Sequence, residues 1–212
     1  MRPLAFVAVL LLAACGDPVR DAPPSPPPAN TASAGPADAP DPQRPIAPGS
    51  RPETTTATIS IEGTDERVDL RLVTVEDVPL PFSTYVPAGW TDDVLGSGEG
   101  TGVRFAMGRP PREGVVTLFV PSEPNRDGLD ELARVVAESN GGAEPLGEAE
   151  PWVRSGYRFA DGDRVGSVRV GEHAGVPFYV LVQHPVEMGD GVGPRAALVL
   201  DRLRWGDDGT AL

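Results

Sequence analysis

The sequence predicts an α+β domain, with helices packed on an antiparallel sheet, preceded by a disordered Pro-rich tether. Short segments of alternating apolar and polar residues are separated by tight-turn signals, so neighbouring strands should pair antiparallel. Two segments repeat apolar residues at helical spacing, and each such helix must bury one apolar face. The length of 212 residues allows one domain of ordinary size with appendages. We place the domain at residues 54–207, with a tail at 208–212.

The N-terminus predicts export from the cytoplasm. An apolar run, residues 3–14, follows a positively charged start and ends at Leu12-Ala13-Ala14-Cys15. A membrane-spanning helix needs about 20 apolar residues, whereas this shorter run has the dimensions of a signal-peptide core. Its ending resembles the lipobox of bacterial lipoproteins. That resemblance implies that residues 1–14 are a lipoprotein signal peptide and that Cys15 is lipidated, with palmitate among the acyl groups. A plain secretory signal with an incidental cysteine is the alternative.

Residues 15–53 comprise the lipidated Cys15 and a linker. Between Asp17 and Glu53 the chain carries 12 of its 25 prolines and only scattered apolar side chains. Such a segment cannot bury enough surface to offset the entropy of ordering, so we expect disorder or local polyproline II structure. It would hold the domain away from the membrane as a spacer. A ligand for a proline-recognition domain is the alternative interpretation.

Alternating residues predict the strands of the domain. Residues 63–66 read as the turn of a first hairpin, and residues 161–163 and 172–175 read as the turns between the last three strands. The glycine-rich segment Leu95–Gly100 reads as a flexible loop, since it lacks a nucleophile elbow and a phosphate-loop lysine. The predicted strands are residues 58–61, 68–72, 82–86, 103–107, 115–120, 153–159, 164–170 and 176–183.

Two helices are predicted, one in the middle and one at the end of the domain. The first begins near Asp127, which could cap it, and ends at Asn140-Gly141. Pro194 suits the first position of the second helix. Apolar residues follow Pro194 at helical spacing as far as Leu203, and Trp205 comes just after them.

Three short segments resemble the PsbP-like domain family. They are Pro81–Trp90 with its Pro-x-Gly-Trp turn, Gly175–Val182, and Leu200–Trp205. Their order, with a helix between the first two, matches that family over roughly Pro79 to Trp205. The resemblance implies an α/β/α sandwich around an antiparallel sheet. It also implies an accessory or binding role, because members of the family resemble one another as binding proteins and not through a shared catalytic site.

The side-chain inventory excludes several function classes. All 18 basic residues are Arg, so lysine-dependent chemistry is absent. With one Cys and two His, a Cys-rich zinc site, a three-His metal site and an intramolecular disulfide are impossible within one copy. A net charge of −13 argues against nucleic acid as a partner.

His184, Glu187 and Asp190 form the best local cluster of reactive groups. An imidazole and two carboxylates at a strand end could bind a metal or act as an acid–base pair. A strand-end histidine followed by a solvated acidic loop is the simpler interpretation. His173 reads as an exposed turn residue, and residues 161–163 read as a turn rather than a calcium loop. The tryptophans Trp90, Trp152 and Trp205 read as core residues, with a ligand pocket as the alternative.

The sequence therefore predicts a lipid-anchored protein of the bacterial cell envelope, with a non-catalytic PsbP-like domain outside the cytoplasm, for example in the periplasm. We expect no catalytic residues, metal or cofactor. The expected partners are the membrane, through Cys15, and a protein or envelope component. The alternative is a small enzyme, or a metal- or solute-binding protein, that uses His184 with Glu187 and Asp190.

Overall fold

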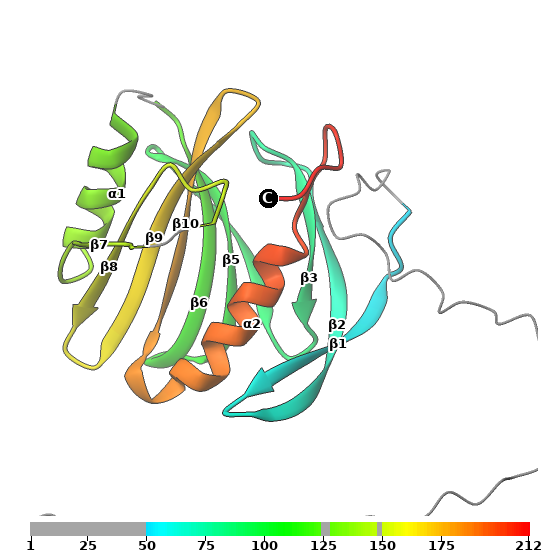
Figure 1. Ribbon diagram of the computed structural model, residues 1–212. Helices are drawn as coiled ribbons and strands as arrows, with labels where there is room; N and C mark the ends of the chain where they lie inside the picture. Colours follow the sequence, from blue (N-terminus) through cyan, green and yellow to red (C-terminus); the bar gives the residue numbers. More distant parts are fainter. Residues whose placement is uncertain (1–49, 124–127, 148–149) are drawn as a thin grey trace, which may run out of the picture. The chain divides into compact units, whose positions relative to one another are not determined.

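Two antiparallel sheets and two α-helices make up the folded part of the chain (Figure 1). The computed structural model describes residues 50–123, 128–147 and 150–212. The α+β class expected from the sequence is confirmed. The signal segment, Cys15 and the linker up to residue 49 lie outside the described residues.

The larger sheet has seven strands in the order β4-β5-β6-β10-β9-β8-β7. Two meanders, β4 to β6 and β7 to β10, join where β6 pairs antiparallel with β10. Its strands are β4 (Thr91–Ser97), β5 (Gly100–Arg109), β6 (Arg112–Pro121), β7 (Glu144–Pro145), β8 (Ser155–Asp161), β9 (Arg164–His173) and β10 (Val176–Pro185).

Strand β4 occupies a segment that we expected to be partly a flexible loop. That expectation for Leu95–Gly100 is wrong: the chain turns at residues 98–99, and Ser97 pairs with Gly100 of β5. Nearly all of β4 is exposed, including Val94, so no alternation of apolar residues marks it in the sequence. Its backbone pairing with β5, and not burial of its side chains, makes this segment a strand.

The first strands form a separate, smaller sheet in the order β1-β2-β3-β11. The expectation of one continuous sheet is wrong here, because β3 is buried on both faces. Phe82 and Val86 enter one apolar cluster, while Tyr85 enters another. The strands are β1 (Thr54–Ile61), β2 (Thr64–Val75), β3 (Phe82–Pro87) and β11 (Arg204–Trp205).

Tight turns with left-handed backbone conformations join the paired strands. Glu62 and Gly63 have φ of 50° and 78° between β1 and β2, and Ala174 and Gly175 have φ of 48° and 79° between β9 and β10. Two consecutive positive φ values match the twist of the flanking strands. The second turn confirms the predicted connection, whereas the first lies one residue earlier than the predicted turn at 63–66.

Helix α1 (Leu129–Glu138) covers the outer face of β8 and β9. Ala133 and Ala137 are fully buried there against Val168 and Val170. The predicted stop at Asn140-Gly141 is confirmed, since the helix ends at Glu138 and Gly141 has a φ of 105°. Asp127 lies outside the described residues.

Helix α2 (Gly189–Asp201) lies on the opposite face of the seven-stranded sheet and also contacts the smaller sheet. A short 3₁₀ helix, η2 (Val186–Met188), precedes it. The prediction that α2 starts at Pro194 is wrong, because the helix begins five residues earlier. Burial overrides the poor helix propensity of this first turn: Val192 is fully buried against Gly114 of β6, where an added Cβ would lie 2.4 Å from a Val192 methyl group.

The main core lies between the two sheets and α2. Trp90 and Trp205 are 4% and 3% exposed, which confirms their assignment to the core. Trp205 lies in β11, after the end of α2, and pairs with Phe82. Residues 208–212 fold back on this region: Ala211 bridges Arg204, and Leu212 packs against the core. The expected tail is thus part of the folded domain.

Candidate functional site

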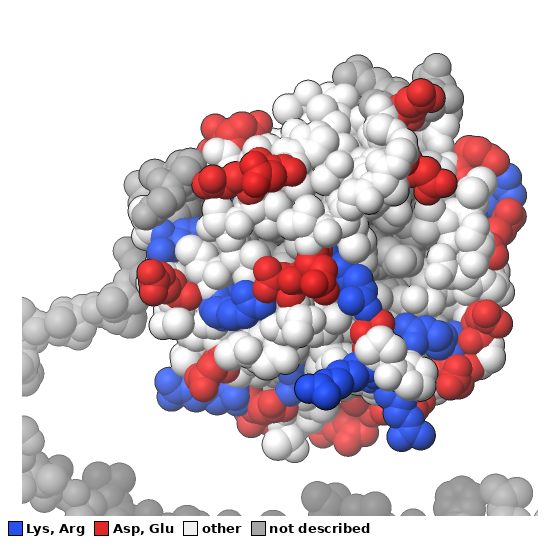
Figure 2. Space-filling view, turned by 180° about the vertical axis from the view of Figure 1, so that it is seen from behind, with Lys and Arg blue, Asp and Glu red and all other residues white. Residues whose placement is uncertain are grey.

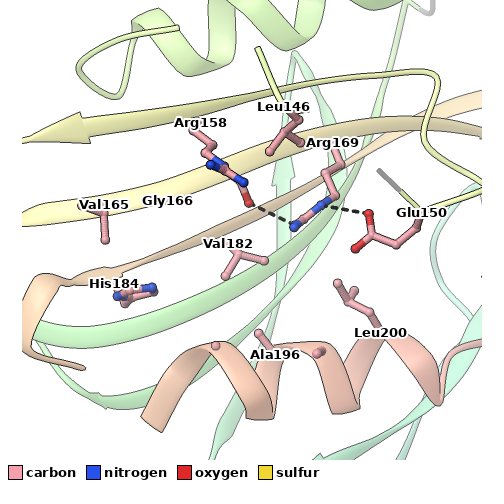
Figure 3. Close-up of a pocket in the computed structure, with 13 residues that line it drawn as sticks. Leu146, Glu150, Arg158, Val165, Gly166, Arg169, Val182, His184, Ala196 and Leu200 are labelled. Atoms are coloured by element: carbon pink, nitrogen blue, oxygen red, sulfur yellow. Dashed lines mark hydrogen bonds and ion pairs between the residues drawn. The ribbon is translucent and has the colours of Figure 1, made fainter. Parts of the chain in front are cut away.

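A cleft of about 600 Å³ opens between α2 and the inner face of strands β8, β9 and β10 (Figure 3). Its volume falls in the range of small-molecule sites, about 300–1,000 Å³. Figure 3 shows Arg158 and Arg169 on the sheet side, facing Ala196 and Leu200 on the helix side. The lining residues are Leu146, Glu150, Arg158, Val165, Gly166, Ser167, Arg169, Val182, His184, Gly193, Ala196, Ala197 and Leu200.

The strand register brings these polar residues to one wall. Arg158 of β8 lies opposite Ser167 of β9, which lies opposite Val182 of β10, so all three share a face of the sheet. The neighbouring rows on that face add Arg169 on one side and His184 on the other. Three strands thus place two guanidinium groups, a hydroxyl and an imidazole along the cleft.

Arg169 is held in place by two partners. Its Nε lies 3.2 Å from the carboxylate of Glu150, and its Nη1 donates a 3.0 Å hydrogen bond to the Ser167 hydroxyl. The side chain of Arg169 is 21% exposed, so it is ordered within the wall while still reaching solvent. Because a guanidinium carries five N–H groups, these two contacts leave part of its donor capacity unused.

Arg158 has a different environment. It lines the cleft and is exposed, and within the described residues it forms no ion pair and no side-chain hydrogen bond. Charged residues on an inner sheet face are usually paired, as Arg169 is. Among the described residues that line it, the cleft therefore holds two guanidinium groups and one carboxylate, in a chain with a net charge of −13.

The imidazole of His184 has a defined tautomer. Its Nδ1 lies 2.8 Å from the carbonyl oxygen of Pro185, and since a carbonyl oxygen only accepts, Nδ1 carries the hydrogen. Its ring packs at the start of α2, where a Cβ added to Gly189 would lie 3.3 Å from Cε1. Within the described residues no hydrogen bond joins His184 to the hydroxyl of Ser167, which accepts from Arg169.

The cluster of His184, Glu187 and Asp190 is not assembled as a ligand set. His184 lines the cleft, but Glu187 lies on the exposed η2 helix, 3.9 Å from Arg112, and Asp190 is exposed in the first turn of α2. In the described part of the chain their ligand atoms do not gather within 4.8 Å of one another. The alternative function thereby loses the convergence on which it depended.

A different histidine has the closest carboxylates. The Nε2 atom of His173 lies 2.9 and 3.0 Å from the two carboxylate oxygens of Asp207, and Asp208 completes a group whose ligand atoms lie within 4.8 Å. The interpretation of His173 as an exposed turn residue is wrong. Its ring stacks on Trp205 at a centroid distance of 4.4 Å, and its side chain is only 14% exposed.

The remaining candidates have structural positions. Residues 161–163 form the β8–β9 turn, as predicted, with Gly162 at a φ of 60°. Trp152 is half-buried and stacks on Phe178 at 5.7 Å between ring centroids. Sequence reasoning missed Arg158 and Arg169. In β9, Val165, Ser167 and Arg169 alternate along the face that lines the cleft. Only the pairing of β8 with β9 shows that Arg158 lines the same space.

No family model matches this chain, and no curated protein is significantly similar to it. Within the described ranges, no helix is long and apolar enough to span a membrane. Acidic and basic side chains intermingle on the face seen in Figure 2, so a single sign of charge does not dominate there.

Proposed function

We propose that this protein is a lipoprotein of the bacterial cell envelope, anchored through Cys15, whose PsbP-like domain binds a ligand or partner without catalysing a reaction. The observation that carries the binding role is the cleft between α2 and β8–β10. It combines an apolar helix wall with the guanidinium groups of Arg158 and Arg169 on the sheet side. An apolar wall on one side and a few fixed polar groups on the other are typical of binding sites.

The PsbP-like part of the proposal is supported by the helices. Helices α1 and α2 cover opposite faces of the seven-stranded sheet, as an α/β/α sandwich requires. The β1–β2 hairpin belongs to the additional four-stranded sheet and goes beyond that pattern.

The anchor is supported by the sequence alone. Cys15 is the only cysteine of the chain and stands directly after the apolar run. The Pro-rich linker then gives the domain reach from the membrane, up to about 3.1 Å per residue in the polyproline II limit.

Metabolic labelling with a fatty-acid analogue tests the anchor. The parent chain should incorporate label, and Cys15→Ser should not, because only a thiol accepts the diacylglyceryl group. Asp17→Asn keeps the thiol and serves as the matched control, so it should be labelled like the parent. Label retained in Cys15→Ser would refute the anchor.

Photo-crosslinking in cells tests the binding role. A photoreactive residue at Ala197, which lines the cleft, should capture a molecule that the same residue at Val135 does not. Val135 is 45% exposed on α1, on the opposite face of the sheet. Equal capture at the two positions would argue against the cleft as the binding site.

A further inference from the structure

We propose that the cleft binds a small organic anion, a carboxylate or a phosphate monoester with a compact apolar body, through Arg158 and Arg169. This inference rests on the proposed binding function and names its ligand class. The two guanidinium groups recognise the anionic head, and the wall of α2 accommodates the apolar body.

The positive charge of the cleft is built in and not incidental. Arg169 is oriented by Glu150 and Ser167, which leaves its Nη2 amino group without a partner among the described residues. Arg158, one row away on the same face, forms no ion pair within the described residues, although Glu144 of β7 lies opposite it in the sheet. A guanidinium fork matches the geometry of a carboxylate or phosphate, and such charge-assisted pairs are stronger than neutral hydrogen bonds.

The carboxylates near the cleft indicate where the anionic head lies. Glu150 is at the end formed by Leu200, and the adjacent Asp201 has its pKa raised first by burial and second by Glu150. Two acidic groups repel an anion from that end. The head therefore belongs beside Arg158 and Ser167, in the middle of the cleft.

The opposite wall favours an apolar body. Gly193, Ala196 and Ala197 have the smallest side chains, and they leave room between α2 and the sheet. Val165 and Val182 add branched apolar surface on the sheet side. An inorganic ion would leave this surface wet, whereas an organic anion would bury it.

Isothermal titration calorimetry on the full chain in phosphatidylcholine nanodiscs tests the inference, with empty nanodiscs as the blank. The probes are 2-naphthoate, 2-naphthyl phosphate and the neutral 2-naphthamide. At least one anion should bind saturably, and at least about tenfold more tightly than the amide, because a hydrogen bond to a charged group contributes about 1.5–3 kcal/mol. The tighter anion identifies the head as carboxylate or phosphate.

Three variants attribute the binding to the cleft. Arg158→Gln should weaken anion binding about tenfold or more without a change in unfolding midpoint, since Arg158 forms no ion pair or side-chain hydrogen bond with any described residue. Arg154→Gln is the matched control, because Arg154 is exposed and outside the cleft, and it should bind like the parent. Glu150→Gln should tighten binding, because glutamine keeps an oxygen that can accept from Arg169 Nε but removes the negative charge that lines the cleft among the described residues. Damage to the fold could not produce that gain.

Several outcomes would overturn the inference. They are no saturable binding of either anion up to about 5 mM, which corresponds to a binding free energy weaker than about 3 kcal/mol, equal binding of the amide, or equal effects of Arg158→Gln and Arg154→Gln. A chain that is acylated and captures a partner at Ala197, but binds neither probe, refutes the anion site alone. A chain that binds an anion but is not acylated refutes the anchor alone.

Discussion

The guanidinium carbon of Arg51 lies 4.5 Å from the centroid of the Tyr85 ring, where the chain enters the folded domain. The same guanidinium donates to the Ser83 carbonyl and hydroxyl at 2.9 and 2.8 Å and to the Arg202 carbonyl at 2.8 Å. The Tyr85 hydroxyl in turn donates to the Pro52 carbonyl at 2.8 Å. Burial lowers the pKa of Arg51, with Tyr85 opposing that shift. Arg51 therefore belongs to the folded domain, although it lies three residues before the expected boundary.

Arg51→Ala should lower the free energy of unfolding by about 1–3 kcal/mol, because it removes charged hydrogen bonds and a cation–π contact together. Arg67→Ala is the matched control, since Arg67 is exposed on β2, and it should change little. Urea unfolding measures both.

Deleting residues 17–49, which spares Arg51, should leave the midpoint near that of the parent. A large loss on that deletion would contradict the tether.

Trp205→Ala should destabilise the domain by about 3–5 kcal/mol, the usual cost of truncating a buried aromatic residue. The indole contacts Phe82 and Phe178 at 6.4 and 5.1 Å between ring centroids and stacks on His173. Trp152→Ala removes a half-buried ring and should cost less. Chemical denaturation compares the two variants. A Trp205→Ala midpoint equal to that of the parent would contradict the core position of this residue.

Local patterns in the sequence predicted the elements whose side chains alternate between core and solvent. Val103 and Phe105 of β5 are buried on either side of the half-buried Arg104, so period-two alternation marks that strand. Strand β6 is buried at every position from Gly114 to Leu118, so it was recognised as a short apolar run. Strand β4 was not predicted, because nearly all of its side chains are exposed and no alternation of apolar residues marks it. The start of α2 was predicted five residues too late. Its glycines and Pro194 have poor helix propensity, which is visible in the sequence, whereas the burial of Val192 against β6 depends on tertiary packing.

The cleft could not be predicted for a related reason. Arg158 and Arg169 are separated along the chain by a hairpin, and the sequence contains many other arginines. The pairing of β8 with β9 places both side chains on one face of the sheet. The position of α2 over that face then forms the cleft that both of them line. Likewise, His173 meets Asp207 only because β11 pairs with β3 and carries Trp205 beneath the imidazole.

Asp207→Asn should remove part of the acid sensitivity of the fold. The hydrogen bond from His173 is the main cause that lowers the pKa of Asp207. A carboxylate whose pKa is lower in the folded state stabilises the fold above its unfolded pKa, about 3.9, and this stabilisation is lost as the pH falls through the folded value. Urea midpoints between pH 7 and pH 3 should thus fall less in Asp207→Asn than in the parent. Asp163→Asn, in the exposed β8–β9 turn, should follow the parent. Identical pH profiles for the parent and Asp207→Asn would refute the coupling.

Ala174→Asn should stabilise the domain by about 1 kcal/mol. Ala174 has a φ of 48° in the turn between β9 and β10, a left-handed conformation that costs an ordinary residue about 1–2 kcal/mol. Asparagine tolerates this conformation, and Asn-Gly is a favoured pair for such a turn, so the substitution relieves the backbone strain at this position while Gly175 stays in place. Ala174→Gly should stabilise less, because glycine also gains entropy in the unfolded chain.

Ala160→Asn is the matched control for that substitution. Ala160 is also exposed, but it lies within β8, paired with Val165 of β9, where asparagine has poor strand propensity. This variant should therefore leave the thermal midpoint unchanged or lower it, while Ala174→Asn raises it by several degrees, in keeping with about 1 kcal/mol for a domain of this size. Because the turn ends β9 at His173, near-ultraviolet circular dichroism of Trp205 should stay the same in Ala174→Asn. A lower midpoint for Ala174→Asn than for Ala160→Asn would show that the turn does not hold residue 174 in the left-handed conformation.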